Sequence, residues 1–469
     1  MIKIVVLGAG ISGLSTAYAL ESLAKRDNLA VEIIVLEKLE RAGGKMMSVK
    51  SDGFLCEWGP NGFLDNKPMT LDLCRSLGIA EALLRSDDNA RKRFIYAANT
   101  LHRLPEDAAS FFKSGLISWP GKLRLGCEML IPAKRDGGDE TLADFARRRL
   151  GSEALERLIG PMVSGIFAGD PETMSLRSCF PRIHQLEQDY GGLLKAMIKL
   201  GRQKRAERKA GKQVASAAGP GGTLTSFAEG IQELTDGLVK KLDAEVRTDS
   251  GVTRIEAKQG GFLLHLEDET QVEAEIVVSA TPAHALAEML TQTDAPAAAL
   301  LKKIPYAPMN VVCFGYERDK ISRDLSGFGY LIAKGEQRHT LGTLWDSSIF
   351  PNRAPEGQVL LRSMFGGATN PQAIELSEEE VKQGTMADLK LIMGIDVEPD
   401  FVRIFRHRRA IPQYVPGHGA RLAELDSRLE NLPGLFLTGN AFFGVGINDC
   451  VNASNQISAR VIAALKKRK

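Results

Sequence analysis

The chain opens, after Met1, with Ile2-Lys3-Ile4-Val5-Val6-Leu7-Gly8-Ala9-Gly10-Ile11-Ser12-Gly13. The apolar run 2–7 shows no alternation, which predicts a strand buried on both faces of a parallel sheet. The glycines that follow match G-x-G-x-x-G, and the apolar segment 14–23 behind them predicts a helix. A second β-rich run, 31–36, ends at Glu37. This order of strand, glycines, helix, strand and acid predicts a dinucleotide-binding βαβ unit.

Each position in this unit has a physical task. Gly8 allows the tight turn from strand to helix, Gly10 lets backbone amides approach a pyrophosphate, and Gly13 lets the helix pack on the sheet. The helix start offers unpaired N–H groups to phosphate, and Ala9, Ile11 and Ser12 lie in the same turn. A glutamate at the end of the second strand accepts hydrogen bonds from a ribose diol. A purely structural turn is the alternative, and the complete order argues against it.

The segment Arg41-Ala42-Gly43-Gly44-Lys45 narrows the cofactor. R-x-G-G directly after the acidic strand is typical of flavoproteins that bind extended FAD, and dehydrogenases that use only NAD usually lack this second glycine pair. Gly43 and Gly44 allow close approach of backbone to the cofactor, and Arg41 or Lys45 is expected near phosphate. The sequence therefore predicts FAD.

Three further stretches are expected to complete the FAD site. The turn-rich loop around 58–60 is a candidate to cover the flavin ring. Val252 is expected beside the adenine of FAD. Near the C-terminus, a buried strand at 435–437 runs into a glycine turn. A second glycine turn, at 444–446, precedes a helix over 451–465. The start of this helix can face the cofactor. The additional residues predicted to bind FAD are Trp58, Gly59, Pro60, Val252, Gly439, Val445, Gly446 and Ile447.

With 469 residues the chain is too long for one ordinary core. The expected fold is α/β plus α, in three parts. A discontinuous Rossmann-like FAD domain comprises 1–85, 222–285 and 420–469. A mixed-sheet substrate domain comprises 86–104, 201–221 and 286–419, and a helical domain comprises 105–200. Residues 201–222 are expected to be a solvated linker, and 224–242 a helix.

Composition excludes several classes of protein. The net charge of +2 gives the whole chain no positive electrostatic potential that would attract nucleic acid. The six cysteines are too scattered for a metal site or a disulfide framework, which indicates a reduced cytoplasmic setting. No apolar run is long enough to span a bilayer. Phe111, Phe112, Leu116, Ile117 and Trp119 near basic residues are equally consistent with a membrane-docking surface and with an ordinary core.

Taken together, these motifs resemble the protoporphyrinogen oxidase family, within the amine-oxidase-like flavoproteins. The resemblance covers nearly the whole chain. Its more specific motifs are Gly59-Pro60, Gly165-Ile166-Phe167-Ala168-Gly169-Asp170-Pro171, Gly327-Phe328-Gly329, Leu341-Gly342-Thr343-Leu344, Ala410-Ile411-Pro412-Gln413-Tyr414, and Gly439-Asn440 with Gly444-Val445-Gly446. The sequence departs from the family pattern at His407, where a tryptophan is common, and at Asn448, where a proline is common.

The resemblance implies oxidation of a porphyrinogen to a porphyrin, with hydride passing to FAD and molecular oxygen as the final acceptor. It implies that Arg93 pairs with a substrate propionate, that Phe328 and Leu331 sandwich a pyrrole ring, that Leu344 and Phe365 line the same pocket, and that Gly165 lies beside the substrate. It also implies peripheral attachment to the cytoplasmic membrane, a homodimer, and transfer of the product to a ferrochelatase.

The sequence contains no Ser/His/Asp or Cys/His arrangement, and no catalytic side chain is predicted, because a flavin that accepts hydride needs the protein mainly for orientation. Arg93 favours protoporphyrinogen IX over coproporphyrinogen III, since the relatives that oxidise the latter tend to lack this arginine. The flavin motifs taken alone would also fit an amine oxidase, a carotenoid desaturase, or a flavin-bearing binding protein without turnover.

Overall fold

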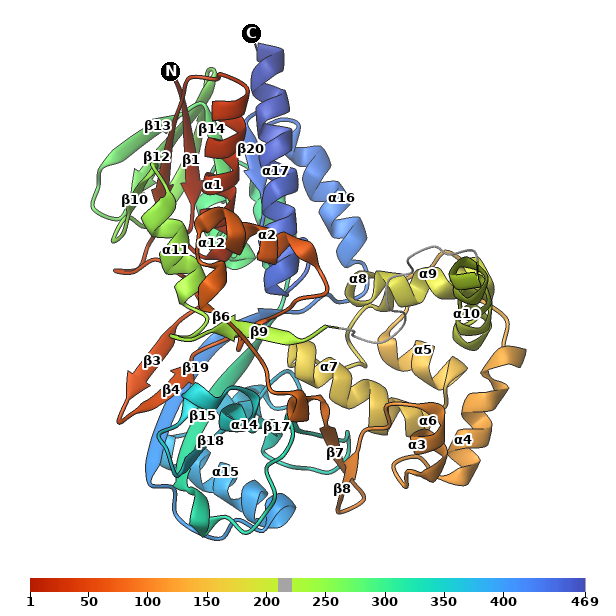
Figure 1. The fold of residues 1–469 in the computed structure, drawn as a ribbon. Helices are drawn as coiled ribbons and strands as arrows, with labels where there is room; N and C mark the ends of the chain where they lie inside the picture. Colours follow the sequence, from red (N-terminus) through yellow and green to blue (C-terminus); the bar gives the residue numbers. More distant parts are fainter. Residues whose placement is uncertain (210–221, 469) are drawn as a thin grey trace. The chain divides into compact units, whose positions relative to one another are not determined.

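The computed structural model describes residues 1–209 and 222–468 and divides the chain into two compact units (Figure 1). The first unit consists of Met1–Ser86, Gly222–Pro305 and Ala420–Lys469, and the second of Asp87–Gly221 and Tyr306–Gly419. Both contain sheets and helices, so the mixed α/β class is as expected. The first unit extends to Pro305 rather than ending at 285, because helices α12 (Ala283–Leu290) and α13 (Ala295–Lys302) belong to it. Within the second unit, a separate helical domain stays a prediction.

The first unit is built on a five-stranded parallel sheet in the order β10-β2-β1-β14-β20. Its strands are β1 (Ile2–Leu7), β2 (Val31–Leu36), β10 (Glu245–Arg247), β14 (Ile276–Ser279) and β20 (Leu435–Leu437). In the central strand Ile4, Val5 and Val6 are completely buried. Their unbroken apolar run fits a strand that is buried on both faces, here by helix α1 (Ile11–Arg26) and by strand β13 (Gln271–Ala274). Three segments far apart in sequence therefore form one nucleotide-type sheet.

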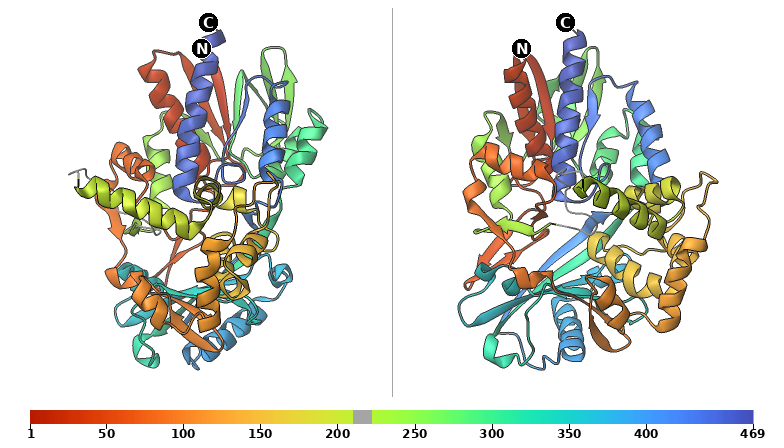
Figure 2. Two further views of the ribbon diagram at one scale, coloured as in Figure 1. Left: turned by 90° about the vertical axis from the view of Figure 1, so that its right-hand side faces the viewer. Right: turned by 45° about the vertical axis from the view of Figure 1, so that its right-hand side comes forward.

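Two helices lie side by side on this sheet, as both views in Figure 2 show. They are α1 (Ile11–Arg26) and α17 (Ile447–Arg468). The Ser454 hydroxyl donates to the Ser12 carbonyl at 2.8 Å, and the Ser458 hydroxyl donates to the Thr16 carbonyl at 3.2 Å. Small hydroxyl side chains allow the two helices to approach closely and satisfy their own polar groups. Besides α12 and α13, the unit also contains α2 (Pro68–Leu77), α11 (Glu233–Lys241) and α16 (His418–Leu429).

Smaller sheets complete the first unit. They are β3-β4 (Ser48–Ser51, Phe54–Glu57), β5-β9-β6 (Phe63–Leu64, Leu224–Phe227, Leu83–Arg85) and β11-β12-β13 (Val252–Lys258, Gly261–Leu266, Gln271–Ala274), with η1 (Ala80–Ala82) beside them. The helix expected over 224–242 is therefore wrong over 224–232, because α11 begins only at Glu233. Residues 224–227 form a strand because they pair with β5 on one edge and with β6 on the other. Gly230, with a φ of +101°, then turns the chain before α11 begins.

The second unit is built on a seven-stranded sheet in the order β19-β15-β18-β17-β16-β7-β8, antiparallel except between β16 and β7. The strands are β7 (Arg93–Ala97), β8 (Thr100–Arg103), β15 (Tyr306–Glu317), β16 (Gly329–Ile332), β17 (Thr340–Leu344), β18 (Gln358–Gly366) and β19 (Phe401–Pro412). Short helices before and between these strands are η2 (Asp88–Arg91), η5 (Arg318–Lys320), α14 (Asp346–Ile349), η6 (Pro351–Arg353) and η7 (Pro371–Ile374).

One face of this sheet packs against α15 (Glu378–Met393) and carries the aromatic core of the unit. That core includes Tyr330, Trp345 and Phe365, each at most 2% exposed. Figure 1 shows α15 against the sheet in the lower part of the picture. The hydroxyl groups of Tyr330, Thr343 and Ser363 form a hydrogen-bonded row on the same face. Because side chains alternate along a strand, the residues between these point to the other face.

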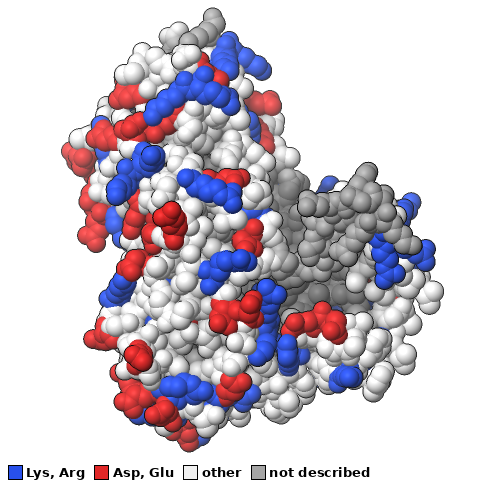
Figure 3. Space-filling model, in the orientation of Figure 1, with Lys and Arg blue, Asp and Glu red and all other residues white. Residues whose placement is uncertain are grey.

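The remaining helices of the second unit are α3 (Ala108–Lys113), α4 (Trp119–Gly126), η3 (Cys127–Leu130), α5 (Leu142–Arg149), α6 (Ser152–Ala154), a π-helical turn η4 (Leu155–Ile159), α7 (Gly160–Phe167), α8 (Leu176–Cys179), α9 (Pro181–Tyr190) and α10 (Leu193–Lys209). The linker expected from 201 is wrong over 201–209, where α10 continues. The rest of that predicted linker, 210–221, lies outside the described residues. On the face seen in Figure 3, the described acidic and basic side chains are interspersed.

Candidate functional site

Two positions of the first glycine turn require glycine, Gly8 for its backbone angle and Gly13 for lack of space. Gly8 has a φ of +92°, and a Cβ on Gly13 would lie 1.8 Å from the Gly8 carbonyl oxygen. Helix α1 begins after Gly10, and no side chain caps its first amides. An uncapped helix start in a glycine turn is a ready site for anionic phosphate. The local geometry expected from the motif is therefore present.

Glu37 is held at the end of β2 by backbone groups. Its Oε2 accepts the Ala9 N–H at 2.7 Å, its Oε1 accepts the Leu39 N–H at 2.9 Å, and the residue is 8% exposed. Two amides fix the carboxylate, and each oxygen retains a further lone pair for a hydroxyl donor. The Glu37 carbonyl accepts the Ser250 N–H at 2.8 Å. This bond brings the start of β11, and so Val252, to the same end of the sheet.

The second glycine pair packs directly on the first turn. Gly43 donates its N–H to the Ala9 carbonyl at 2.7 Å, and a Cβ on Gly44 would lie 3.1 Å from the Gly10 Cα. Both glycines have positive φ angles, +105° and +57°. Arg41 donates to the Gly44 carbonyl at 2.6 Å and lies 5.1 Å from the centre of the Trp58 ring. Arg41 thus stabilises its own loop and orders Trp58.

Lys45 and Gly59 meet beside this loop. A Cβ on Gly59 would lie 2.4 Å from the Lys45 carbonyl oxygen, so only glycine allows the 58–60 loop to lie here. Burial lowers the pKa of the Lys45 amine to about 8. A nearby anionic group would favour the charged amine again. Lys45 rather than Arg41 is therefore the cation of this segment that suits a phosphate.

The C-terminal turns complete the cradle. Gly439 has a φ of +113°, and a Cβ there would lie 3.9 Å from the Ser12 Oγ, so the 439 turn meets the start of α1. Gly444 also has a positive φ, +111°, and its turn leads through Val445 and Gly446 into α17. The Thr438 hydroxyl is buried and has no partner among the described residues. Buried hydroxyls are normally hydrogen-bonded, so this one suits a polar ligand.

These residues fit an extended dinucleotide. The glycine turns leave open a path that side chains would block, and two helix starts and one unpaired hydroxyl border it. Two residues here were not expected from the sequence. Thr438 precedes the predicted Gly439 and could have been found as a hydroxyl at a buried strand end. Asn448 accepts from the Thr70 hydroxyl at 2.6 Å and donates to the Leu64 carbonyl at 2.9 Å, which anchors the start of α17.

In the second unit, the strand register collects four residues on one face of the sheet. Arg93 and Leu344 are both registered with Gly329, and Leu331 lies two residues beyond Gly329. Met364 is registered with Gly342, two residues before Leu344. Because partners in register point the same way, Arg93, Leu331, Leu344 and Met364 share a surface, here called the Leu331 face. All four are partly buried.

Helix α7 lies against the Leu331 face. A Cβ on Gly165 would lie 2.9 Å from Leu331 Cδ1, so this glycine allows the close approach. The Arg93 guanidinium carbon lies 5.1 Å from the centre of the Phe328 ring. No carboxylate of the described residues forms an ion pair with Arg93, and burial lowers its pKa. A partly buried cation over an aromatic ring, without an acidic partner, suits an anionic ligand.

Phe365 does not lie on the Leu331 face, and its predicted place in the pocket is wrong. It is completely buried on the α15 face, where its ring stacks on His339 with 5.7 Å between ring centres. The reason is the alternation of side chains along β18. Met364, one residue earlier, takes the place on the Leu331 face that the sequence assigned to Phe365.

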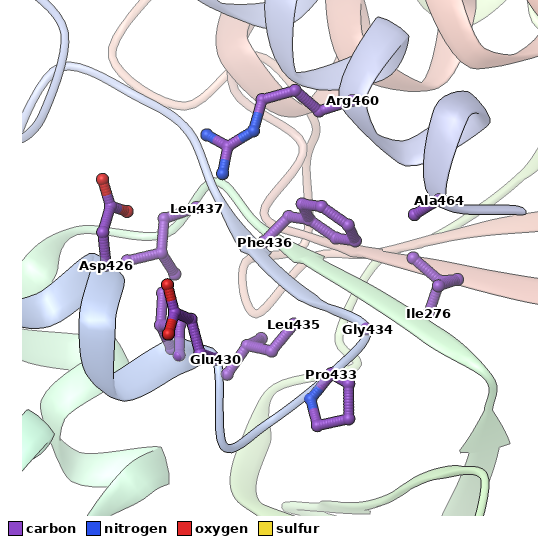
Figure 4. Close-up of a pocket in the computed structure, with 11 residues that line it drawn as sticks. Ile276, Asp426, Glu430, Pro433, Gly434, Leu435, Phe436, Leu437, Arg460 and Ala464 are labelled. Atoms are coloured by element: carbon purple, nitrogen blue, oxygen red, sulfur yellow. The ribbon is translucent and has the colours of Figure 1, made fainter. Parts of the chain in front are cut away.

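A separate cavity of about 370 Å³ opens at the edge of the five-stranded sheet, between β20 and helices α16 and α17 (Figure 4). Figure 4 shows Asp426 from α16, Glu430 directly after that helix, and Arg460 from α17 around it. None of the eleven residues that line it is among those predicted to bind FAD or substrate. Its open, mixed-charge rim has no feature of a cofactor cradle.

Comparisons with known proteins agree with this geometry. The family model described as flavin containing amine oxidoreductase matches residues 11–462. Coproporphyrinogen III oxidase of Bacillus subtilis is 32% identical over 96% of this chain and 95% of its own length. Protoporphyrinogen oxidase 1 of Arabidopsis thaliana chloroplasts is 33% identical over 97% of this chain and 87% of its own length.

A crystal structure of an Exiguobacterium protein, provisionally named a protoporphyrinogen oxidase, superimposes with a TM-score of 0.83 at 26% identity, over 99% of each chain. These matches confirm the expected FAD cofactor and oxidoreductase class. The chain belongs to the flavin-containing amine oxidoreductase family and, within it, to the porphyrinogen oxidase group that these relatives represent.

Proposed function

We propose that the chain oxidises protoporphyrinogen IX to protoporphyrin IX in tetrapyrrole biosynthesis. The observation that carries this proposal is Arg93, a partly buried cation without an acidic partner among the described residues, on the same face as Leu331 and Leu344. A porphyrinogen offers what this face lacks, namely carboxylates for the guanidinium and a large apolar ring for the leucines. The relatives named above act on two such substrates.

The protein contributes orientation. Arg93 would hold a propionate through a charge-assisted hydrogen bond, and Phe328 keeps the guanidinium in place from its other side. Leu331 and Leu344 would hold the macrocycle, with Gly165 and α7 behind Leu331. FAD, when bound, supplies the hydride acceptor. Fixed orientation lowers the entropic part of the barrier, so no strong protein base is required.

Oxidation of the porphyrinogen removes six electrons and six hydrogens, in three two-electron steps. With molecular oxygen as the acceptor, three O₂ are reduced to three H₂O₂ for each porphyrin formed. Measuring oxygen uptake, peroxide and porphyrin fluorescence in one reaction tests this proposal. A ratio of three peroxide to one porphyrin is expected. Porphyrin formation without oxygen uptake would instead indicate a different acceptor.

Coproporphyrinogen III is the second candidate substrate, because the Bacillus subtilis relative of that name matches almost the whole chain. The two substrates differ in the number of propionates, four against two. Comparing kcat/KM for the two porphyrinogens decides between them, and a higher value for protoporphyrinogen IX is expected. If neither substrate bleaches the flavin absorbance in the absence of oxygen, the oxidase proposal fails. A primary amine or a carotene that bleaches it would then favour the amine oxidase or desaturase branch of the family.

We also infer that helices α3, α4 and η3 dock on a membrane surface. Phe112, Trp119, Leu123 and Leu130 are between 55% and 82% exposed. The Lys122 ammonium lies 4.6 Å from the Trp119 ring and donates to the carbonyls of Phe112 and Ser114. This lysine therefore holds two exposed aromatic segments together. Apolar tips beside the exposed Lys113, at the end of α3, suit the interface of an anionic bilayer.

Leu116 and Ile117 take no part in this surface. They are 1% and 2% exposed and pack in a core with Ile95, so of the two alternatives that the sequence left open, the ordinary core applies to them. No described helix is both long and apolar enough to cross a membrane. Co-sedimentation with vesicles that contain anionic lipid tests the docking surface. Trp119→Ser with Leu123→Ser should release the protein, and Leu391→Ser, an exposed leucine on α15, should not. Cytoplasmic location, the homodimer and product transfer to a ferrochelatase stay predictions.

A further inference from the structure

Two fully buried charged side chains meet beside the Leu331 face. Arg362 Nε donates to Asp346 Oδ2 at 2.7 Å, and the two side chains are 1% and 0% exposed. Arg362 is registered with Leu344 on the neighbouring strand, and Asp346 is the first residue of α14. Burying an ion pair is costly, and a well-packed apolar pair of the same volume is often as stable. The pair therefore suggests a role besides stability.

The contacts of Asp346 lead to Phe328. Trp345, which precedes Asp346, donates its backbone N–H to the Phe328 carbonyl at 3.0 Å. The Trp345 ring packs on the Phe94 ring with 5.4 Å between centres. A Cβ on Gly327 would lie 2.8 Å from the Trp345 ring and 2.9 Å from the Phe94 ring. The backbone at Gly327, directly before Phe328, therefore packs tightly against the Trp345 ring, and the position of this ring determines where Phe328 lies.

Phe328 in turn connects to Arg93. Its N–H donates to the Lys92 carbonyl at 2.8 Å, and its ring lies 5.1 Å from the Arg93 guanidinium carbon. An arginine side chain has several rotatable bonds, so a ring beside it restricts the guanidinium. We propose that the buried Arg362–Asp346 pair positions the Phe328–Arg93 pair, through α14 and Trp345, and so determines how well the protein selects a carboxylate-bearing macrocycle.

This inference rests on the proposed function, and Arg362 is a positioning residue in it. The test compares two probes, protoporphyrin IX and its dimethyl ester, by titration against the protein's intrinsic fluorescence. The wild-type holoenzyme should bind the free acid at least about tenfold more tightly than the ester, because one hydrogen bond to a charged group is lost in the ester. Arg93→Ala should abolish this ratio.

Arg362→Met should lower the ratio of free-acid to ester affinity at least threefold. In the double variant Arg93→Ala/Arg362→Met, this ratio should be no lower than in Arg93→Ala alone. Such non-additivity is expected only if both residues act on one interaction. Arg149→Met is the matched control, since Arg149 lies 2.9 Å from Glu128 and both side chains are 0% exposed. It should lower the melting temperature and leave the ratio unchanged. An Arg362→Met variant that behaves like this control would overturn the proposal.

Gly327→Ala decides the question if Arg362→Met does not fold. It retains every charge and displaces Phe328 by a methyl group against two rings, so the ratio should fall while the flavin content stays intact. An unchanged ratio in Gly327→Ala contradicts the proposed route. A wild-type protein that binds neither probe would overturn the proposed function itself. A wild-type ratio that is lost in Arg93→Ala, and kept in both positioning variants, would overturn only this inference.

Discussion

Gly165 and Leu331 touch so closely that a methyl group on Gly165 would lie 2.9 Å from Leu331 Cδ1. Carbon atoms do not pack at this distance, so any larger residue at 165 moves the leucine or the helix. The contact explains why a glycine stands in the middle of α7, where it weakens the helix. The glycine determines where the apolar wall of the Leu331 face lies.

Gly165→Ala should raise KM for the porphyrinogen about tenfold, because overpacking costs about 1–3 kcal/mol and here falls on a substrate wall. Steady-state kinetics with protoporphyrinogen measure it. Gly126→Ala is the control, since a Cβ there meets nothing within 4 Å. An equal KM in both variants would show that Leu331 does not contact the substrate.

Gly13→Ala should abolish FAD binding. The added Cβ would lie 1.8 Å from the Gly8 carbonyl oxygen, and both atoms belong to backbone segments that cannot move independently. The ratio of flavin to protein absorbance after purification measures the effect. Gly419→Ala, where a Cβ again meets nothing within 4 Å, should retain full flavin content. A flavin-loaded Gly13→Ala protein would contradict the assigned turn.

Thr438→Val should weaken FAD binding and leave the flavin-free protein equally or more stable. The Thr438 hydroxyl is buried without a partner among the described residues, so removing it costs no hydrogen bond there and relieves a desolvation penalty of about 1–3 kcal/mol. FAD titration and thermal unfolding of the flavin-free protein give the two quantities. Lower stability with unchanged FAD affinity would mean that the hydroxyl serves the fold.

Glu128→Gln should destabilise the second unit by about 1–3 kcal/mol, because it removes the nearer of two buried carboxylates that pair with Arg149 and leaves only Glu187, at 3.5 Å. Glu128 also accepts the first amides of α10, from Leu193 at 2.8 Å and Leu194 at 3.1 Å. Urea unfolding measures the loss. Asp72→Asn removes a surface ion pair with Arg75, whose side chains are 65% and 62% exposed, and should cost less than about 1 kcal/mol. If both variants lost the same free energy of unfolding, the buried ion pair would contribute no more to stability than the surface pair.

Lys45 should make the stability of the flavin-free protein depend on pH. Its pKa is lowered from 10.5 to about 8 by burial, so between these values the unfolded chain binds a proton that the folded protein does not. The free energy of unfolding contributed by Lys45 therefore rises as pH increases from about 8 to 10.5. The difference between wild type and Lys45→Met, followed by urea unfolding, isolates this contribution. A difference that stays constant over this range would contradict a buried amine.

The sequence by itself determined the nucleotide turn and the cofactor. Gly8, Gly10 and Gly13 follow a buried strand, and both their spacing and their backbone geometry are local properties that neighbouring residues decide. The family followed from motifs spread along the chain. The strand at 224–227 could not be predicted from the sequence, because its pairing partners β5 and β6 are more than a hundred residues away in the chain.

Only the tertiary structure decided which side chains share a face. Phe365 and Met364 are neighbours in sequence, and the register of β18 against β17 sends one to the α15 core and the other to the Leu331 face. The contacts from Arg362 to Arg93 likewise depend on strand order, since residues 93, 328 and 362 lie on three different segments. Local pattern specifies a turn, whereas a face of a sheet exists only after distant strands have paired.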